Sequence, residues 1–144
     1  MINSKKKLIF LVDDDALFLK SLEIDFKQNP EWDIKTYATG ESCLENLPEN
    51  PDVIVLDYYL NGIEQKAIDG LETLIQIKSL YPDIPVIMLS SQDSIDVAVN
   101  CMKHKAFDYI VKNETAFIRL QKAIATISHY QKIEKALNWY MNKV

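Results

Sequence analysis

The sequence predicts an α/β fold, in which helices cover both faces of a parallel β-sheet. Apolar runs and amphipathic stretches alternate five times along 144 residues, and this alternation implies parallel strand pairing through right-handed crossovers. A chain of this length has room for one domain with a short appendage. Its hydrophobic residues (48%) and charged residues (26%) are close to globular averages, which excludes a disordered chain.

The first half of the chain contains two predicted strands, each followed by a helix. Residues 8–12 form a continuous apolar run that ends at three consecutive aspartates, as a buried strand and its loop do. Apolar residues over 18–26 recur at helical spacing, and a proline soon ends that helix. Residues 33–37 alternate in polarity, which indicates a strand with one wet face. Thr39 opens a short helix that two prolines stop.

The second half repeats this pattern. Its apolar runs lie at residues 53–56, 86–89 and 107–111. Asp69 is placed to cap the helix between the first two runs. The helix after the second run carries its apolar residues at helical spacing, at Ile95, Ala98, Val99 and Met102. A long helical pattern begins near Glu114.

The polarity of the strands predicts their order in the sheet. The first, third and fourth runs are apolar throughout, as strands covered on both faces are, whereas the second and fifth are mixed, as edge strands tend to be. Placing the second and fifth strands outside gives the order 2-1-3-4-5. We therefore expect a flavodoxin-like (βα)5 three-layer sandwich with an extended C-terminal helix.

The extension is predicted from the last residues of the chain. Apolar residues continue at spacings of three and four with no Gly or Pro between them, at Tyr130, Ile133, Leu137, Tyr140 and Val144. We divide the chain into a domain over residues 1–128 and a helical extension or linker over 129–144 without an output domain. We favour a dimerising or linker helix, because this spacing suits a helix seam; the alternative is a cap that folds back.

Composition argues against several kinds of partner. The net charge of −5 disfavours direct binding to nucleic acid or to an anionic membrane. No apolar run approaches the roughly 18 residues that span a bilayer. The two cysteines, Cys43 and Cys101, form no CxxC motif and are interpreted as reduced thiols. We expect a cytoplasmic protein.

Polar residues at the ends of four strands predict a functional site. Ligands of an open α/β sheet bind at the carboxyl ends of the strands, where the winding direction switches. In the order 2-1-3-4-5 this point lies between the first and third strands, which end in Asp13-Asp14 and Asp57. The fourth strand ends in Ser90 and the fifth in Lys112. One rim therefore receives three carboxylates, a hydroxyl and an ammonium group.

These charges indicate a chemistry. Three neighbouring carboxylates repel one another, so a proton or a cation must neutralise them, and oxygen ligands favour Mg²⁺. A carboxylate beside such a metal can attack phosphorus. Lys112 supplies a positive charge and Ser90 a hydroxyl donor for the phosphoryl oxygens. The site is thus predicted to carry a phosphoryl group on Asp57.

Several ordered motifs support this interpretation. They are residues 10–15 (FLVDDD), 55–60 (VLDYYL), 69–71 (DGL), 86–91 (VIMLSS) and 108–112 (DYIVK). Over about residues 7–127 the chain resembles the receiver domain of two-component response regulators, the CheY-like family. The resemblance implies that a sensor histidine kinase or a phosphotransfer protein donates the phosphoryl group to Asp57.

The resemblance also implies roles for other residues. Asp14, Asp57 and the backbone carbonyl of Tyr59 would bind Mg²⁺, and Asp13 would act through metal-bound water. Ser90 and Tyr109 would form the switch pair that alters the surface of the fourth helix, fifth strand and fifth helix. Separately from the resemblance, we consider a homodimer, formed through either that surface or the C-terminal helix.

The sequence departs from the family at three places. Residues 61–68 contain an insertion beside the site. Asn113 replaces a proline that usually follows in a cis peptide, which leaves the position of Lys112 open, and Lys105 replaces a usual glycine at a left-handed position. At the variable positions Tyr59 and Gln92, we expect the bulky Tyr59 to screen the acyl phosphate from water.

Two rival functions fit the sequence less well. A small Mg²⁺-dependent phosphohydrolase would use Asp13 as nucleophile and Asp15 as acid, but Ala16-Leu17 does not fit the usual continuation of that motif. A nucleotide-binding module would need a glycine-rich phosphate loop, whereas the three glycines here are widely separated. The prediction is therefore a phosphoacceptor module whose only chemistry is phosphorylation and dephosphorylation of its own Asp57.

Overall fold

Five parallel strands form one sheet in the computed structural model, which describes residues 5–60 and 68–143. The strands are β1 (Lys7–Val12), β2 (Trp32–Tyr37), β3 (Val53–Asp57), β4 (Val86–Ser90) and β5 (Asp108–Val111). Their order is β2-β1-β3-β4-β5, with every neighbouring pair parallel. This confirms the predicted order, including both edge strands.

Helices follow each strand as the sequence pattern predicts. They are α1 (Ala16–Phe26), α2 (Gly40–Glu45), α3 (Gly70–Leu80), α4 (Ile95–Lys103) and α5 (Ala116–Lys143). Asp69 caps α3 as expected, because its side chain accepts a hydrogen bond from the backbone N–H of Glu72. The sequence did not reveal the 3₁₀ turn η1 (Leu47–Glu49), which carries Pro48 near its start.

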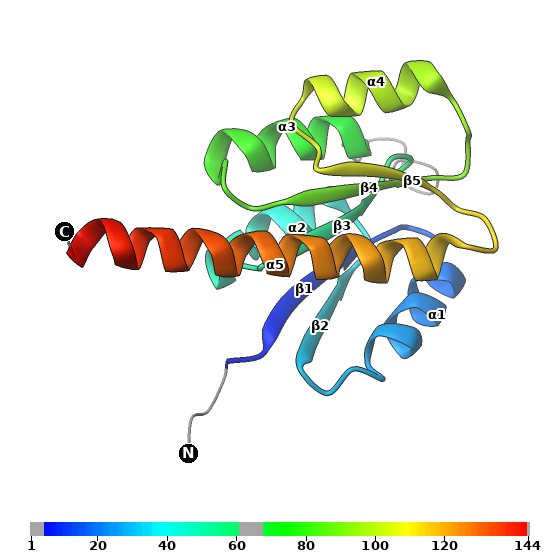
Figure 1. Cartoon of the computed structure of the whole chain (residues 1–144). Helices are drawn as coiled ribbons and strands as arrows, with labels where there is room; N and C mark the ends of the chain where they lie inside the picture. The colour runs from blue at the N-terminus through cyan, green and yellow to red at the C-terminus, as the bar shows by residue number, and fades with distance from the viewer. Residues whose placement is uncertain (1–4, 61–67, 144) are drawn as a thin grey trace.

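The helices lie on both faces of the sheet and so make three layers (Figure 1). α1 and α5 cover one face, where Leu22, Phe26 and Leu120 pack with alternate residues of the strands. α2, α3 and α4 cover the other, where Cys43, Leu74 and Cys101 are buried. Strands β3 and β4 are buried along their whole length, as strands with both faces covered must be.

The apolar stripe of α4 does not pack against the sheet. Ile95 is 79% exposed, and Val99 and Met102 are about half exposed. Val97 and Cys101 contact the core instead. Helical spacing shows that apolar residues share a face, but it does not show whether the sheet or another surface covers that face.

Lys105 and Asn113, which replace the family's usual glycine and proline near β5, differ in their backbone conformation. Lys105 adopts φ 73°, so a lysine occupies the left-handed position where the family usually has glycine, as the sequence predicted. A side chain there costs about 1–2 kcal/mol relative to glycine. None of the peptide bonds among residues 5–60 and 68–143 is cis, so the bond between Lys112 and Asn113 is trans.

Helix α5 continues well past the sheet. In its first half, Leu120, Ile124 and Ile127 are buried against the sheet. Just beyond them, the side chain of Gln131 accepts from Lys7 Nζ (3.0 Å) and donates to the carbonyl of Asp52 (3.3 Å). The later turns are exposed and project away from the sheet at the red end of the ribbon in Figure 1. No helix in the part of the chain that is described is both long and apolar enough to cross a membrane.

Candidate functional site

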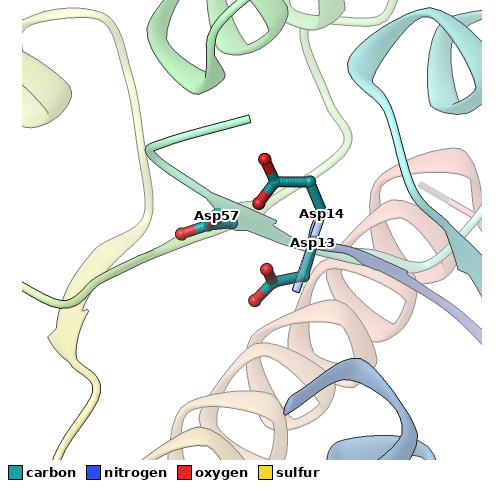
Figure 2. Close-up of side chains that lie close together, drawn as sticks. All are labelled: Asp13, Asp14 and Asp57. Carbon is teal, nitrogen blue, oxygen red and sulfur yellow. The ribbon is translucent and has the colours of Figure 1, made fainter. Parts of the chain in front are cut away.

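Three aspartates meet at the carboxyl ends of β1 and β3 (Figure 2). Asp13 and Asp14 directly follow β1, and Asp57 is the last residue of β3. One carboxylate oxygen from each lies within 4.8 Å of the others. Asp13 is 2% exposed and Asp57 is 3% exposed, whereas Asp14 is half-buried. Parallel pairing of β1 with β3 brings these acids together from distant parts of the sequence.

Lys112 enters the same site from the end of β5. Its Nζ lies 2.7 Å from Asp13 Oδ2 and 3.3 Å from Asp57 Oδ1. Its backbone N–H donates to the carbonyl of Ser90 at 2.7 Å, which ties the start of the loop to β4. The contact with Asp13 is an ion pair without hydrogen-bond geometry, so this buried oxygen receives no hydrogen bond from the described residues.

The electrostatics of the site favour a proton or a cation on Asp57. Burial, and next the charge of Asp13, raise the pKa of Asp57 to about 7, although Lys112 opposes the shift. Burial disfavours the charged form of Lys112, but its contacts with Asp13 and Asp57 outweigh burial and raise its pKa. The ammonium therefore stays charged, while the carboxylates repel one another.

The backbone below Asp57 is held by close packing of α3. A Cβ atom on Gly70 would lie 2.2 Å from the carbonyl oxygen of Asp57 and 2.6 Å from Cα of Tyr58. The N–H of Gly70 donates to the carbonyl of Tyr58 at 2.9 Å, and Tyr58 N–H donates to Leu89. Only glycine permits this approach, so the DGL motif serves packing as well as capping.

Three predicted residues, Tyr59, Ser90 and Tyr109, form hydrogen bonds with a fourth, Gln92. The hydroxyl of Tyr59 donates to Gln92 Oε1 at 3.0 Å, and the hydroxyl of Tyr109 donates to the backbone carbonyl of Gln92. The N–H of Gln92 donates to Oγ of Ser90 at 3.1 Å, and Ser90 is fully buried. The loop after β4 is therefore connected to both tyrosines. The sequence identified these residues but not the bonds between them.

Asp15 has a structural contact instead of a place in the acidic cluster. Its Oδ1 accepts hydrogen bonds from the N–H groups of Leu17 and Phe18 and so caps α1. The cluster that could hold a metal among the described residues consists of Asp13, Asp14 and Asp57. This arrangement disfavours Asp15 as the acid of a phosphohydrolase.

The sequence did not predict one contact near the site, and most of the predicted insertion lies outside the described residues. Lys112 Nζ lies 4.4 Å from the ring centroid of Phe18, a residue that the sequence pattern had assigned only to the apolar face of α1. Nothing in the sequence signals this contact, because the two residues are distant in the chain. Of the predicted insertion at residues 61–68, only Ile68 lies within the described residues; its N–H donates to Glu41 Oε2 at 3.3 Å.

Comparison with known proteins gives consistent relatives. A putative NtrX-like response regulator of Rickettsia typhi is 36% identical over 121 residues, which cover 81% of this chain and 25% of that protein. The DNA-binding transcriptional regulator NtrC of Escherichia coli K12 is 31% identical over 142 residues, covering 96% of this chain and 28% of that protein. The chain thus spans about a quarter of the length of these curated relatives.

A solved structure and the family's own sequence pattern agree with these relatives. The receiver domain of NtrX from Brucella abortus is 28% identical with a TM-score of 0.70, and the match covers 82% of this chain and 98% of that one. The pattern that defines the response regulator receiver domain matches residues 9–125. This chain therefore belongs to the receiver domains of two-component response regulators.

Proposed function

We propose that Asp57 accepts a phosphoryl group from a phosphohistidine of a sensor kinase or phosphotransfer protein. The observation that carries this proposal is the placement of Asp57 beside two further acids and 3.3 Å from Lys112. The acids favour a bound cation, and the lysine offers a positive charge for the oxygens of an incoming phosphoryl group. A nucleophile, charge neutralisation and an electrostatic clamp are thus present on one rim.

The transfer forms a bond between a carboxylate oxygen of Asp57 and phosphorus. The phosphorus–nitrogen bond to the donor imidazole breaks, and the imidazole keeps the electron pair and takes up a proton. Lys112 moves its charge toward the phosphoryl oxygens, and the hydroxyl of Ser90 donates to one of them. Hydrolysis later returns the carboxylate, so the chain acts only on itself.

The acids fit a magnesium ion, which receiver domains typically bind through acidic residues. Three carboxylates and one ammonium leave an excess of negative charge, and the buried Asp13 Oδ2 has only its ion pair with Lys112 and no hydrogen bond among the described residues. Asp14, Asp57 and the carbonyl of Tyr59 would hold the ion, with Asp13 acting through water. The ion would supply shielding of charge between the carboxylate and the phosphoryl group.

Phosphorylation is proposed to reach the surface through Ser90 and Tyr109. Ser90 Oγ now accepts a hydrogen bond from the backbone N–H of Gln92. If the Ser90 hydroxyl donates to a phosphoryl oxygen, it would move away from Gln92. Gln92 also accepts from Tyr109 on β5. Movement of this loop would therefore alter the surface of α4, β5 and the start of α5, where Ile95 and Val99 are exposed.

The C-terminal extension, residues 129–144 beyond the receiver domain of 1–128, is proposed to dimerise the chain. Tyr130, Ile133, Leu137 and Tyr140 are exposed at spacings of three and four on one continuous helix. Pairing two such helices would bury these side chains in a seam. The surface of α4, β5 and α5 is the alternative contact, because its apolar stripe is also exposed.

The first prediction concerns the acceptor residue. Incubation with acetyl phosphate and Mg²⁺ should add the mass of one phosphoryl group, and Asp57→Asn should abolish this gain because it removes the nucleophile. Intact-mass spectrometry measures the gain, and peptide mapping after borohydride reduction locates it. Asp33→Asn, an exposed carboxylate on β2, is the matched control. Release of phosphate that survives Asp57→Asn would instead support a phosphohydrolase.

The second prediction concerns pH and metal. The folded protein keeps the Asp57 proton up to about pH 7, whereas the unfolded chain releases it near pH 4. The proton held on Asp57 therefore adds to the free energy of unfolding fully below about pH 4. This added stability declines as the pH rises toward about 7 and is lost above that pH. Without Mg²⁺, the free energy of unfolding of the wild type relative to Asp57→Asn should fall by about 1–3 kcal/mol between pH 5 and pH 7.

Urea titrations at several pH values measure this difference. Millimolar Mg²⁺ should restore the loss at pH 7, because the ion binds the ionised carboxylates and stabilises the folded state. A difference that does not change between pH 5 and pH 7 would contradict the raised pKa of Asp57. Asp33→Asn again serves as the control, because its carboxylate is exposed.

The third prediction concerns the lifetime of the acyl phosphate. Tyr59 is 37% exposed, and its hydroxyl bonds to Gln92 across the rim. Tyr59→Ala should speed spontaneous hydrolysis several-fold, because water then reaches the phosphoryl group. Tyr59→Phe keeps the ring without the hydrogen bond and separates screening from bonding. Loss of the phosphoprotein mass over time measures the hydrolysis rate. An unchanged rate for Tyr59→Ala would refute screening.

The fourth prediction concerns oligomeric state. Size-exclusion light scattering should find a dimer for the full chain and a monomer for a chain that ends at Ser128. Ile133→Ser with Leu137→Ser should also give a monomer, because both exposed seam residues lose their apolar groups. Lys132→Ser with Lys135→Ser is the matched control on the same helix. If truncation at Ser128 leaves the oligomeric state unchanged, the extension is not the dimer contact.

A further inference from the structure

Lys112 lies between the acids on one side and an aromatic ring on the other. Its Nζ is 2.7 Å from Asp13 Oδ2 and 4.4 Å from the ring centroid of Phe18. The lysine side chain is 15% exposed, so the ammonium is largely removed from water. A cation over a ring face is attracted by the electron density of that face, and the attraction grows as water is excluded.

The ring of Phe18 is itself fixed from two directions. Phe117 on α5 packs edge-to-face against it, with ring centroids 5.9 Å apart at 74°. The backbone N–H of Phe18 donates to Oδ1 of Asp15, the N-cap of α1, at 3.2 Å. Phe18 is half-buried on the first turn of that helix. The cap of α1 and the first turn of α5 together fix the position of the ring below the ammonium.

The fixed ring of Phe18 restricts where the side chain of Lys112 can lie. The residues after Lys112 are exposed: Asn113, Glu114 and Thr115. The backbone N–H of Lys112 is anchored on Ser90, but a lysine stem has four rotatable carbons beyond that anchor. The acids attract the ammonium without defining its direction. The ring face holds it from the opposite side and leaves its N–H groups available for phosphoryl oxygens.

We propose that Phe18 is a positioning residue for phosphoryl transfer, whose ring face holds the Lys112 ammonium beside Asp57. The inference rests on the proposed function, because it concerns the same reaction. It adds a requirement that neither the acids nor the lysine impose: an aromatic side chain on the first turn of α1. The ring of Phe18 contacts the ammonium of Lys112, and in this proposal it acts through that lysine.

The experiment compares phosphorylation rates of variants at position 18. Phe18→Leu keeps an apolar side chain without the ring face, and it should slow the modification of Asp57 by acetyl phosphate and Mg²⁺ by about 3- to 30-fold. Phe18→Trp and Phe18→Tyr keep a ring face and should retain most of the wild-type rate. Leu19→Ala, half-buried in the same core, is the control for lost packing and should leave the rate unchanged.

A double-mutant cycle shows whether Phe18 acts through Lys112. The folding equilibrium constant is measured by urea unfolding for the wild type, Phe18→Leu, Lys112→Met and the double variant, which needs no phosphorylation. Phe18→Leu should lower this constant about 3-fold or more further in the wild type than in the Lys112→Met background. A merely structural role would give the same loss in both backgrounds.

The outcomes separate this inference from the function on which it rests. If the wild type never gains a phosphoryl group, the proposed function is wrong. If the wild type is phosphorylated and Phe18→Leu is equally fast, only the role of Phe18 is wrong. Equal losses in the two backgrounds of the cycle, or a slow Phe18→Trp that is folded, also overturn it. Slow phosphorylation of Phe18→Leu, fast phosphorylation of Phe18→Trp and unequal losses in the cycle support it.

Discussion

Repulsion among three carboxylates at the ends of β1 and β3 is the constraint to which the rest of the site responds. Asp13 and Asp57 are almost fully buried, and their oxygens lie within 4.8 Å of those of Asp14. Burial, together with the charge of Asp13, raises the pKa of Asp57 to about 7, so the cluster is unfavourable without a proton or a cation. The same instability makes the site receptive to a cation and to a phosphoryl group.

The scaffold around the acids keeps them from moving apart. The parallel register of β1 and β3 sets the positions of Asp13 and Asp57, and α3 packs directly on the backbone of Asp57 at Gly70. Lys112 comes from β5, two strands from β3 in the sheet, and is tied to β4 through Ser90. A compact sheet thus holds like charges together, and one ammonium group partly balances them.

The same rim connects the acids to the surface. Gln92 bonds to Tyr59 just after β3, to Ser90 at the end of β4 and to Tyr109 within β5, so contacts with three neighbouring strands hold the loop after β4. Beyond this loop, α4 presents an apolar stripe to the outside instead of to the sheet. A change of charge at Asp57 is therefore close, through a few hydrogen bonds, to a surface that is suited to a protein partner.

The sequence by itself determined the sheet order and the residues of the rim. Runs such as Val53–Asp57 are apolar until their last residue, and parallel topology brings all such ends to one edge. Only the tertiary structure decided that the stripe of α4 faces outward and that Gln92 connects two tyrosines. It alone placed Phe18 beneath Lys112 and Gly70 against Asp57. Periodicity and strand-end chemistry are local properties of a chain, whereas these contacts join segments that are distant in sequence and exist only after packing.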